Sequence, residues 1–231
     1  TRVYTLNLCE MDKSMHFNPF PYIRNRSDIT KLVTNLIQNT NSPNIKNSSA
    51  DPFWEKAEKM FLESLFLYVW MECPKAYFNT EKGKVELLQQ NWKSILFLLD
   101  EAQFLDNDTS PKLDERMNEL ARKKPDHPAV KAYQRYRGGP DDTIRSVIMT
   151  VNARMQPFDN EELLEIFSSN DIPLDEFGTG IDGDGKTKSN LFIIIPDDDD
   201  TFNFVPGMVY TMLFQELYRQ ARFFGGKLPM D

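Results

Sequence analysis

The residues from Leu191 to Ile195 form a short, unbroken apolar run that ends at Pro196. A run of this length before a proline predicts a β-strand, and an apolar residue at every position is typical of a strand covered on both faces of a parallel sheet. Four aspartates follow at 197–200, and a helix is predicted around 210–218. The order of buried strand, polar corner and helix indicates an α/β fold.

Between the two ends of the chain, apolar residues recur at the spacing of helices. Asp51 and Pro52 predict the start of the first helix, as its N-cap and its first helical residue. From Leu65 onward this helix is apolar nearly all round, which indicates a buried position. A second helix, with Trp92 on its apolar face, is predicted over 84–105. Further helices are predicted from residue 110 and over 128–136, 143–155 and 160–167.

These patterns predict an α/β chain with a large all-helical insert. The strand Val3–Leu8 and the strand at 191–195 are expected to share one parallel sheet. The predicted domains are an α/β domain formed by 1–39 and 176–231, and a helical bundle formed by 40–175. Residues 39–49, rich in Asn and Ser, predict a flexible entry to the bundle.

Composition excludes several classes of protein. The 231 residues are 40% hydrophobic and 12% aromatic, which excludes general disorder. The longest apolar run, 65–71, is far shorter than the ~20 residues that a membrane-spanning helix needs. Cys9 and Cys73 do not form a disulfide framework, and with His16 and His127 they lack the spacing of a zinc site. The net charge of -8 argues against tight, nonspecific nucleic-acid binding by the whole surface.

Two segments match nucleotide-binding motifs in sequence, but the secondary structure predicted around them differs from that of a working motif. Gly180–Thr187 has the spacing of a phosphate-binding loop, but a strand follows it, whereas a working loop follows a strand and opens a helix. Asp182 and Asp184 would also place negative charge beside a phosphate. Asp100 and Glu101 resemble the Asp-Glu pair of a nucleoside triphosphatase, but the apolar residues around them keep helical spacing. We interpret the first segment as a surface loop and the second as solvated acids at a helix end.

Positive charge gathers between residues 111 and 154, where ten lysines and arginines stand against six acidic residues. If the chain contacts a nucleic acid or a protein partner, the candidate residues are Arg122, Lys123, Lys124, Lys131, Arg135 and Arg137. Tyr133 and Tyr136 lie among them, and aromatic rings beside cations can stack with single-stranded bases. Helical spacing equally lets both tyrosines point inward while the cations cover a solvated face.

Both ends of the chain resemble the type IV coupling proteins, the TraG-type ATPases of conjugative elements. In that family a strand with Lys-x-x-Leu-Phe-x-x-Ile-Pro-Asp leads to a helix with Tyr-Thr-x-Leu-Phe, and Lys188–Asp197 and Tyr210–Phe214 match these patterns. Val3–Leu8, Ser14 and Phe17–Ile23 are similar to the strand and Asn-Pro stretch near the start of the family's motor domain. Asp51–Ala57 is similar to the start of its helical insert.

The resemblance implies a RecA-like fold for the partial parallel sheet and a role in conjugation. The intact protein would be a homohexameric, DNA-translocating ATPase of a plasmid or conjugative transposon. It would bind ATP and magnesium and would couple relaxase-bound single-stranded DNA to the proteins of a type IV secretion channel. Its anchor would lie in the bacterial inner membrane, and this chain would be a cytoplasmic part that includes the all-alpha insert.

The same resemblance implies that this chain carries no catalytic, cofactor-binding or metal-binding residue. The family's phosphate-binding loop is expected before residue 1, and its metal-binding Asp-Glu motif after Pro229. Two alternatives stay open from the residues alone. One is a self-contained nucleotide hydrolase that uses Gly180–Thr187 with Asp100 and Glu101, and the other is a helical adaptor that binds protein.

Overall fold

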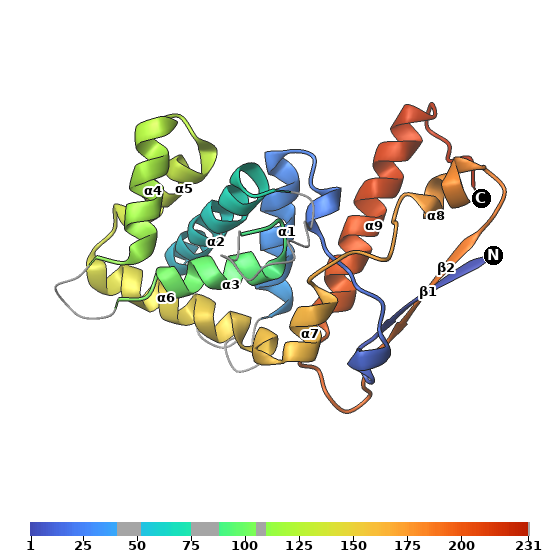
Figure 1. Ribbon diagram of the computed structural model, residues 1–231, viewed down its shortest axis with the longest axis horizontal. Helices are drawn as coiled ribbons and strands as arrows, with labels where there is room; N and C mark the ends of the chain where they lie inside the picture. Colours follow the sequence, from blue (N-terminus) through green and yellow to red (C-terminus); the bar gives the residue numbers. More distant parts are fainter. Residues whose placement is uncertain (41–51, 75–87, 105–109, 231) are drawn as a thin grey trace, which may run out of the picture. The chain divides into compact units, whose positions relative to one another are not determined.

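The computed structural model describes residues 1–40, 52–74, 88–104 and 110–230 (Figure 1). The chain forms two compact units, which are residues 1–22 with 157–231 and residues 23–156. The first unit holds two strands and several helices, and the described residues of the second are helices and their connections. The predicted α/β class with a large helical part and an incomplete parallel sheet is confirmed. The domain bounds 1–39, 176–231 and 40–175 stay a prediction.

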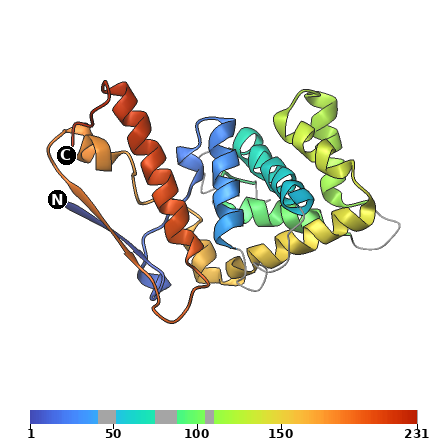
Figure 2. The ribbon, with the colours of Figure 1, turned by 180° about the vertical axis from the view of Figure 1, so that it is seen from behind.

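In the first unit, β1 (Arg2–Asn7) and β2 (Ser189–Ile194) pair in parallel. The register runs from Arg2 opposite Ser189 to Asn7 opposite Ile194, and both views show the two strands side by side (Figures 1 and 2). The predicted parallel pairing of an early and a late strand is therefore confirmed.

The prediction that β2 is covered on both faces is wrong for the described structure. Its residues alternate between half-buried and exposed, and Phe192 and Ile194 are 55% and 42% exposed. In the described part of the chain, β2 pairs with one strand only and packs against the short helix α8 (Glu176–Thr179). With a single neighbouring strand and one short helix against it, half of its side chains remain in solvent.

The core of the first unit is built from aromatic side chains of distant segments. Phe158 lies with ring centroids 5.3 Å from Phe167 and 5.4 Å from Phe204, and Phe17 lies 6.2 Å from Phe167. All four rings are buried. They join the segment after β1 to α7 (Glu161–Ile166) and to the start of α9 (Phe204–Phe223), the helix predicted after the late strand.

The second unit is arranged around α2 (Pro52–Glu72). This helix packs against α1, α3, α5 and α6, and the rear view shows α1 beside it (Figure 2). The helices around it are α1 (Arg26–Asn39), α3 (Trp92–Glu101), α4 (Lys112–Lys123), α5 (Pro128–Arg137) and α6 (Asp141–Met155). Phe61, Leu62, Leu65 and Phe66 of α2 are fully buried, which confirms its predicted central position. None of the helices in the described ranges is both long enough and apolar enough to cross a bilayer.

The helix α1 was not predicted, although its sequence carries the signals. The side chain of Asn25 accepts a hydrogen bond from the backbone N–H of Asp28, and the Asp28 carboxylate accepts one from the N–H of Asn25, which makes a capping box. The apolar residues that follow keep helical spacing and are all buried: Ile29, Leu32, Val33, Leu36 and Ile37.

The second predicted helix begins later than expected. Asn91 is the N-cap of α3, and its side chain accepts a hydrogen bond from the N–H of Ser94, so the helix begins at Trp92. Gln89 and Gln90 precede it and belong to no helix. The predicted residues 84–87, like the predicted N-cap Asp51, lie outside the described residues.

A buried ion pair connects three helices of the second unit. Arg154 of α6 places Nη2 2.8 Å from Oε2 of Glu58 on α2, and the two side chains are only 8% and 7% exposed. Its Nη1 donates to the carbonyl of Ile37 and to the Thr40 hydroxyl, each at 2.8 Å. One guanidinium thus satisfies both a buried carboxylate and the C-terminal end of α1.

The two cysteines are free thiols in different environments. Cys9 is exposed and follows β1, whereas Cys73 follows α2 and is buried. Burial raises the pKa of the Cys73 thiol to about 12.

Candidate partner interface on the basic helices

The six candidate cations lie on two adjacent helices, α4 and α5, which Figure 1 shows side by side. Arg122 and Lys123 stand in the last turn of α4, and Lys124 is its C-cap. Lys131 lies within α5, and Arg135 and Arg137 stand in its last turn. Cations are favourable at the C-terminal end of a helix, where the helix dipole is negative, and this applies to all of the six except Lys131. All are exposed except Arg137, which is half-buried.

Arg137 has a structural role. Its Nε and Nη2 donate to the two carboxylate oxygens of Asp114, both at 3.0 Å, and its Nη1 donates to Asp141 at 2.9 Å. The hydrogen bonds to Asp114 raise the pKa of Arg137 above its ordinary value. This guanidinium joins α5 to the first turns of α4 and α6, and each of its three nitrogens donates to a carboxylate.

Two of the lysines form ion pairs at the surface. Lys124 Nζ lies 2.8 Å from Oε1 of Glu72, and Lys131 Nζ lies 2.7 Å from Oδ1 of Asp126. The lysine side chains are 55% and 49% exposed. Exposed pairs of this kind are weak and are screened by salt, so either lysine can exchange its carboxylate for an anionic partner.

Three of the six cations remain unpaired within the described residues. Arg122, Lys123 and Arg135 are exposed, and the structure gives them no ion pair or side-chain hydrogen bond in the ranges it describes. They are therefore the members of the predicted patch that are ready to bind an anionic group without first breaking a contact.

The tyrosines between these cations do not face solvent. Tyr133 and Tyr136 are 5% and 4% exposed. The Tyr133 hydroxyl donates to Asp114 at 2.8 Å, and the Tyr136 ring stacks on Phe61 with centroids 4.6 Å apart. The base-stacking role considered for these rings is wrong for this structure, and the inward orientation is the correct alternative.

The Gly180–Thr187 segment does not fit a phosphate. It lies between α8 and β2, so a strand follows it, as the sequence predicts. Oδ1 of Asp184 accepts hydrogen bonds from the backbone N–H groups of Lys186 and Thr187, both at 2.9 Å. Bonds from the side chain and backbone of Thr187 lower the pKa of Asp184 to about 2. A carboxylate thus already holds the N–H groups that a phosphate would need.

Asp100 and Glu101 lie at the end of α3, as helical spacing predicts, and not on a strand. Asp100 is exposed, but the interpretation of Glu101 as a solvated acid is wrong. Nη2 of Arg116 donates to Oε1 of Glu101 at 2.6 Å, Nε donates to its other oxygen, and the Glu101 side chain is 13% exposed. Glu101 therefore joins α3 to α4 and is not placed to bind a metal.

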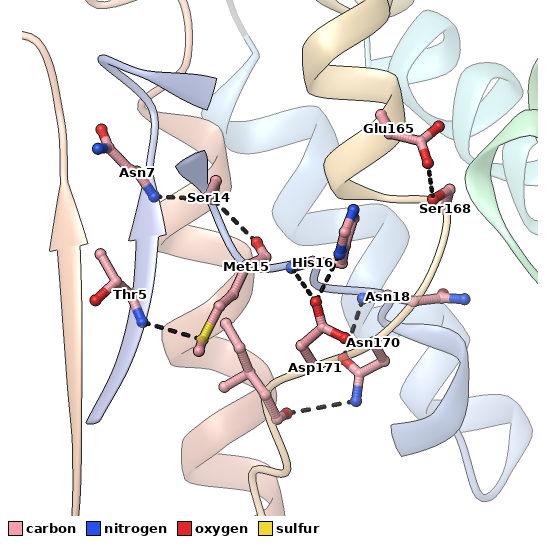
Figure 3. A network of polar contacts seen from close by, with 11 residues as sticks. Thr5, Asn7, Ser14, Met15, His16, Asn18, Glu165, Ser168, Asn170 and Asp171 are labelled. Atoms are coloured by element: carbon pink, nitrogen blue, oxygen red, sulfur yellow. Dashed lines mark hydrogen bonds and ion pairs between the residues drawn. The ribbon is translucent and has the colours of Figure 1, made fainter. Parts of the chain in front are cut away.

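A polar network in the first unit was not predicted (Figure 3). It joins the segment after β1 to the segment after α7. Oδ2 of Asp171 accepts from the backbone N–H of His16 at 3.0 Å and contacts its ring Nδ1, while Asn18 N donates to Oδ1 of Asn170 at 3.2 Å. Burial raises the pKa of Asp171, but the bonds from His16 outweigh it and leave the pKa below its ordinary value.

The network also holds the hydroxyl of a buried tyrosine. Tyr22 donates to the carbonyl of Ile172 and accepts from Asn170 Nδ2 at 2.7 Å and from the N–H of Leu174 at 3.2 Å. These bonds lock together two segments that are far apart in sequence, which indicates a structural role. Among the described residues, no group of three or more His, Cys, Asp or Glu side chains is placed to hold a metal ion.

The chain belongs to the family of type IV secretory system conjugative DNA transfer proteins, whose model matches residues 1–229. The match covers nearly the whole chain and confirms the resemblance to TraG-type coupling proteins. Conjugation, type IV secretion and DNA transfer are thus the processes to which the chain belongs. No curated protein matches the chain.

Proposed function

We propose that this chain is part of a coupling ATPase that recruits relaxase-bound single-stranded DNA to a type IV secretion channel. In this proposal the helical unit, residues 23–156, recognises the relaxase complex and takes no part in catalysis. Membership of the conjugative DNA transfer family is the observation that carries the proposal. The patch formed by Arg122, Lys123, Lys124, Lys131 and Arg135 is the contact surface that we propose.

The geometry favours a protein over bare DNA as the direct partner of this patch. Binding of single strands without sequence preference combines cations with exposed aromatic rings, and both tyrosines of the patch are buried. The chain as a whole carries a net charge of -8, which repels a polyanion. A few unpaired cations at helix ends suit an acidic protein surface, while the DNA of the complex adds a salt-dependent attraction.

The remaining parts of the proposal concern the intact protein. It would form a homohexamer, bind ATP and magnesium, and sit at the inner membrane beside the channel proteins with this part in the cytoplasm. The cofactors would be held by residues other than Gly180–Thr187 and Asp100–Glu101, because neither segment has the geometry of a nucleotide or metal site. A self-contained hydrolase is for the same reason the weaker alternative.

The test compares two charge reversals of equal size. Arg122→Glu with Lys123→Glu changes two unpaired cations of the patch, and Lys31→Glu with Lys56→Glu changes two exposed lysines elsewhere in the helical unit. Binding of the full chain to a labelled relaxase–DNA complex is measured at about 50 and 200 mM salt, where contacts to phosphate weaken strongly.

We expect the patch variant to lose binding by at least tenfold and the control pair to bind like the parent. Labelled single-stranded DNA alone should bind weakly to all three proteins. Equal binding of the patch variant and the parent would refute the proposed contact surface.

A further inference from the structure

The helical unit contains an apolar pocket next to the basic patch. Its walls come from α2, α5 and α6, and it has a volume of about 200 Å³. Phe53 and Met60 line one side, and Tyr136, Ile144 and Val147 line the other. An engineered apolar cavity of ~150 Å³ is large enough to bind benzene. This pocket is therefore large enough for one phenyl ring or a large aliphatic side chain.

The side of the pocket that Tyr136 lines is held in place by contacts that do not depend on a ligand. The Tyr136 ring stacks on Phe61, which is fully buried, with centroids 4.6 Å apart. Its hydroxyl donates to the carbonyl of Ile144 at 3.2 Å and so connects α5 to α6. A ligand would thus enter a site that is already formed, which reduces the ordering cost of binding.

Among the described residues that line the pocket, Arg135 alone is charged. It is exposed, and in the described ranges no acidic side chain pairs with it. By contrast, Arg137 two residues later is held by Asp114 and Asp141. A guanidinium binds carboxylates through two parallel hydrogen bonds. The pocket therefore combines a space for an apolar side chain with a cation available to an adjacent acid.

We propose that this pocket binds an acidic peptide segment of the protein partner. A large apolar side chain would fill the pocket, and a carboxylate one or two residues away would pair with Arg135. The proposal rests on the proposed function, because it gives the chemistry of the partner that the basic patch recognises.

A nucleobase is the poorer occupant of the same space. Its edge carries several hydrogen-bonding groups, and burying them without partners is costly. Besides Arg135, the pocket walls offer the Thr143 hydroxyl, while the Tyr136 hydroxyl already donates to a backbone carbonyl. An apolar amino-acid side chain makes no such demand.

The test selects peptides from a displayed library of random 12-residue sequences on the full chain. Two variants alter the pocket. In Gly139→Leu a new side chain occupies the space, and a Cβ there would meet nothing closer than the Tyr136 carbonyl at 3.7 Å, so the backbone tolerates it. Phe53→Ala removes a ring that lines the pocket, and because the Phe53 side chain is exposed, its loss should disturb the fold little.

Two charge variants complete the set. Arg135→Glu reverses the pocket cation, and Lys31→Glu reverses an exposed lysine outside both the pocket and the patch as the matched control. We expect selected peptides to carry an apolar residue within two positions of Asp or Glu. Their affinity should fall at least tenfold in Arg135→Glu and in both pocket variants, and should change less than threefold in Lys31→Glu.

Three outcomes would overturn the inference. These are an empty selection, selected peptides that bind Gly139→Leu and Phe53→Ala as well as the parent, and a labelled oligonucleotide that binds the pocket better than any peptide. Failure of the proposed function gives a different result. The relaxase complex would then bind the patch variant as well as the parent, while the selected peptides still bound in the pocket. A fourth outcome, in which the patch variant loses relaxase binding while Gly139→Leu keeps it in full, would refute the pocket but not the proposed function.

Discussion

Replacing Arg154 with methionine should destabilise the helical unit more than any surface change. The substitution keeps much of the packing volume but removes the guanidinium from Glu58, whose side chain is 7% exposed. Breaking a buried ion pair by removing one partner costs about 3–5 kcal/mol, because the other charge stays buried and uncompensated. The carbonyl of Ile37 at the end of α1 also loses its donor. We expect a loss of about 4 kcal/mol in the free energy of unfolding.

The matched variants separate charge from packing. Glu58→Leu combined with Arg154→Met removes both charges, and replacing a buried pair with apolar residues is often neutral or stabilising. The double variant should therefore regain most of the lost stability. Lys131→Ala, which removes one member of an exposed pair, should leave stability unchanged.

Urea unfolding followed by tryptophan fluorescence provides the assay. All three tryptophans of the chain, at 54, 70 and 92, belong to the helical unit, so the signal reports that unit. The dependence of the free energy of unfolding on urea concentration should have the same slope in all variants, and only the midpoint of the unfolding transition should change. A loss below about 1 kcal/mol for Arg154→Met, or a double variant as unstable as the single one, would refute the reasoning.

Three further predictions use the same assay or simple binding measurements. Leu65→Ala and Trp92→Ala should each cost about 2–5 kcal/mol because both side chains are fully buried, and a neutral result in urea unfolding would contradict the helix packing. Burial lowers the pKa of His127, so the unfolded chain takes up a proton first as the pH falls. The stability that neutral, buried His127 contributes to folding is present above about pH 6.5 and is lost below it. His127→Asn can still cap α5 and should reduce the loss of stability between pH 7.5 and 5.5. Lys186→Ala should leave the response of the chain to Mg-ATP in calorimetry unchanged, and ATP binding that this substitution abolishes would restore Gly180–Thr187 as a nucleotide site.

The elements that depend on local signals were predictable from the sequence. Helical spacing gave α2 and α4–α7 within a few residues, and even the overlooked α1 carries a capping box at Asn25 and Asp28. The exposure of β2 was not predictable, because an apolar run does not state how many neighbours the strand has. What surrounds Phe192 depends on segments far away in sequence.

For the candidate site, too, the sequence predicted some properties of the charges and not others. The six cations were found by composition, and the exposure of most of them follows from their positions near helix ends. Which of them are paired depends on contacts between helices, such as Asp114, which accepts bonds from both Tyr133 and Arg137. The bonding of Glu101 to Arg116 is a second contact of this kind. A single sequence does not reveal such partners, and they decide which charges are available for binding.

Cys9 is exposed in the first unit and Cys73 is buried in the second, so labelling of their thiols can follow the two units separately. An alkylating reagent reacts with the thiolate, so the folded chain should be modified at the exposed Cys9 while Cys73, with its pKa near 12, is protected. A dye on Cys9 would then follow the strand-containing unit, as the tryptophans follow the helical one. Slow labelling of Cys73 would measure how often the end of α2 opens, and would show whether binding of a partner closes it.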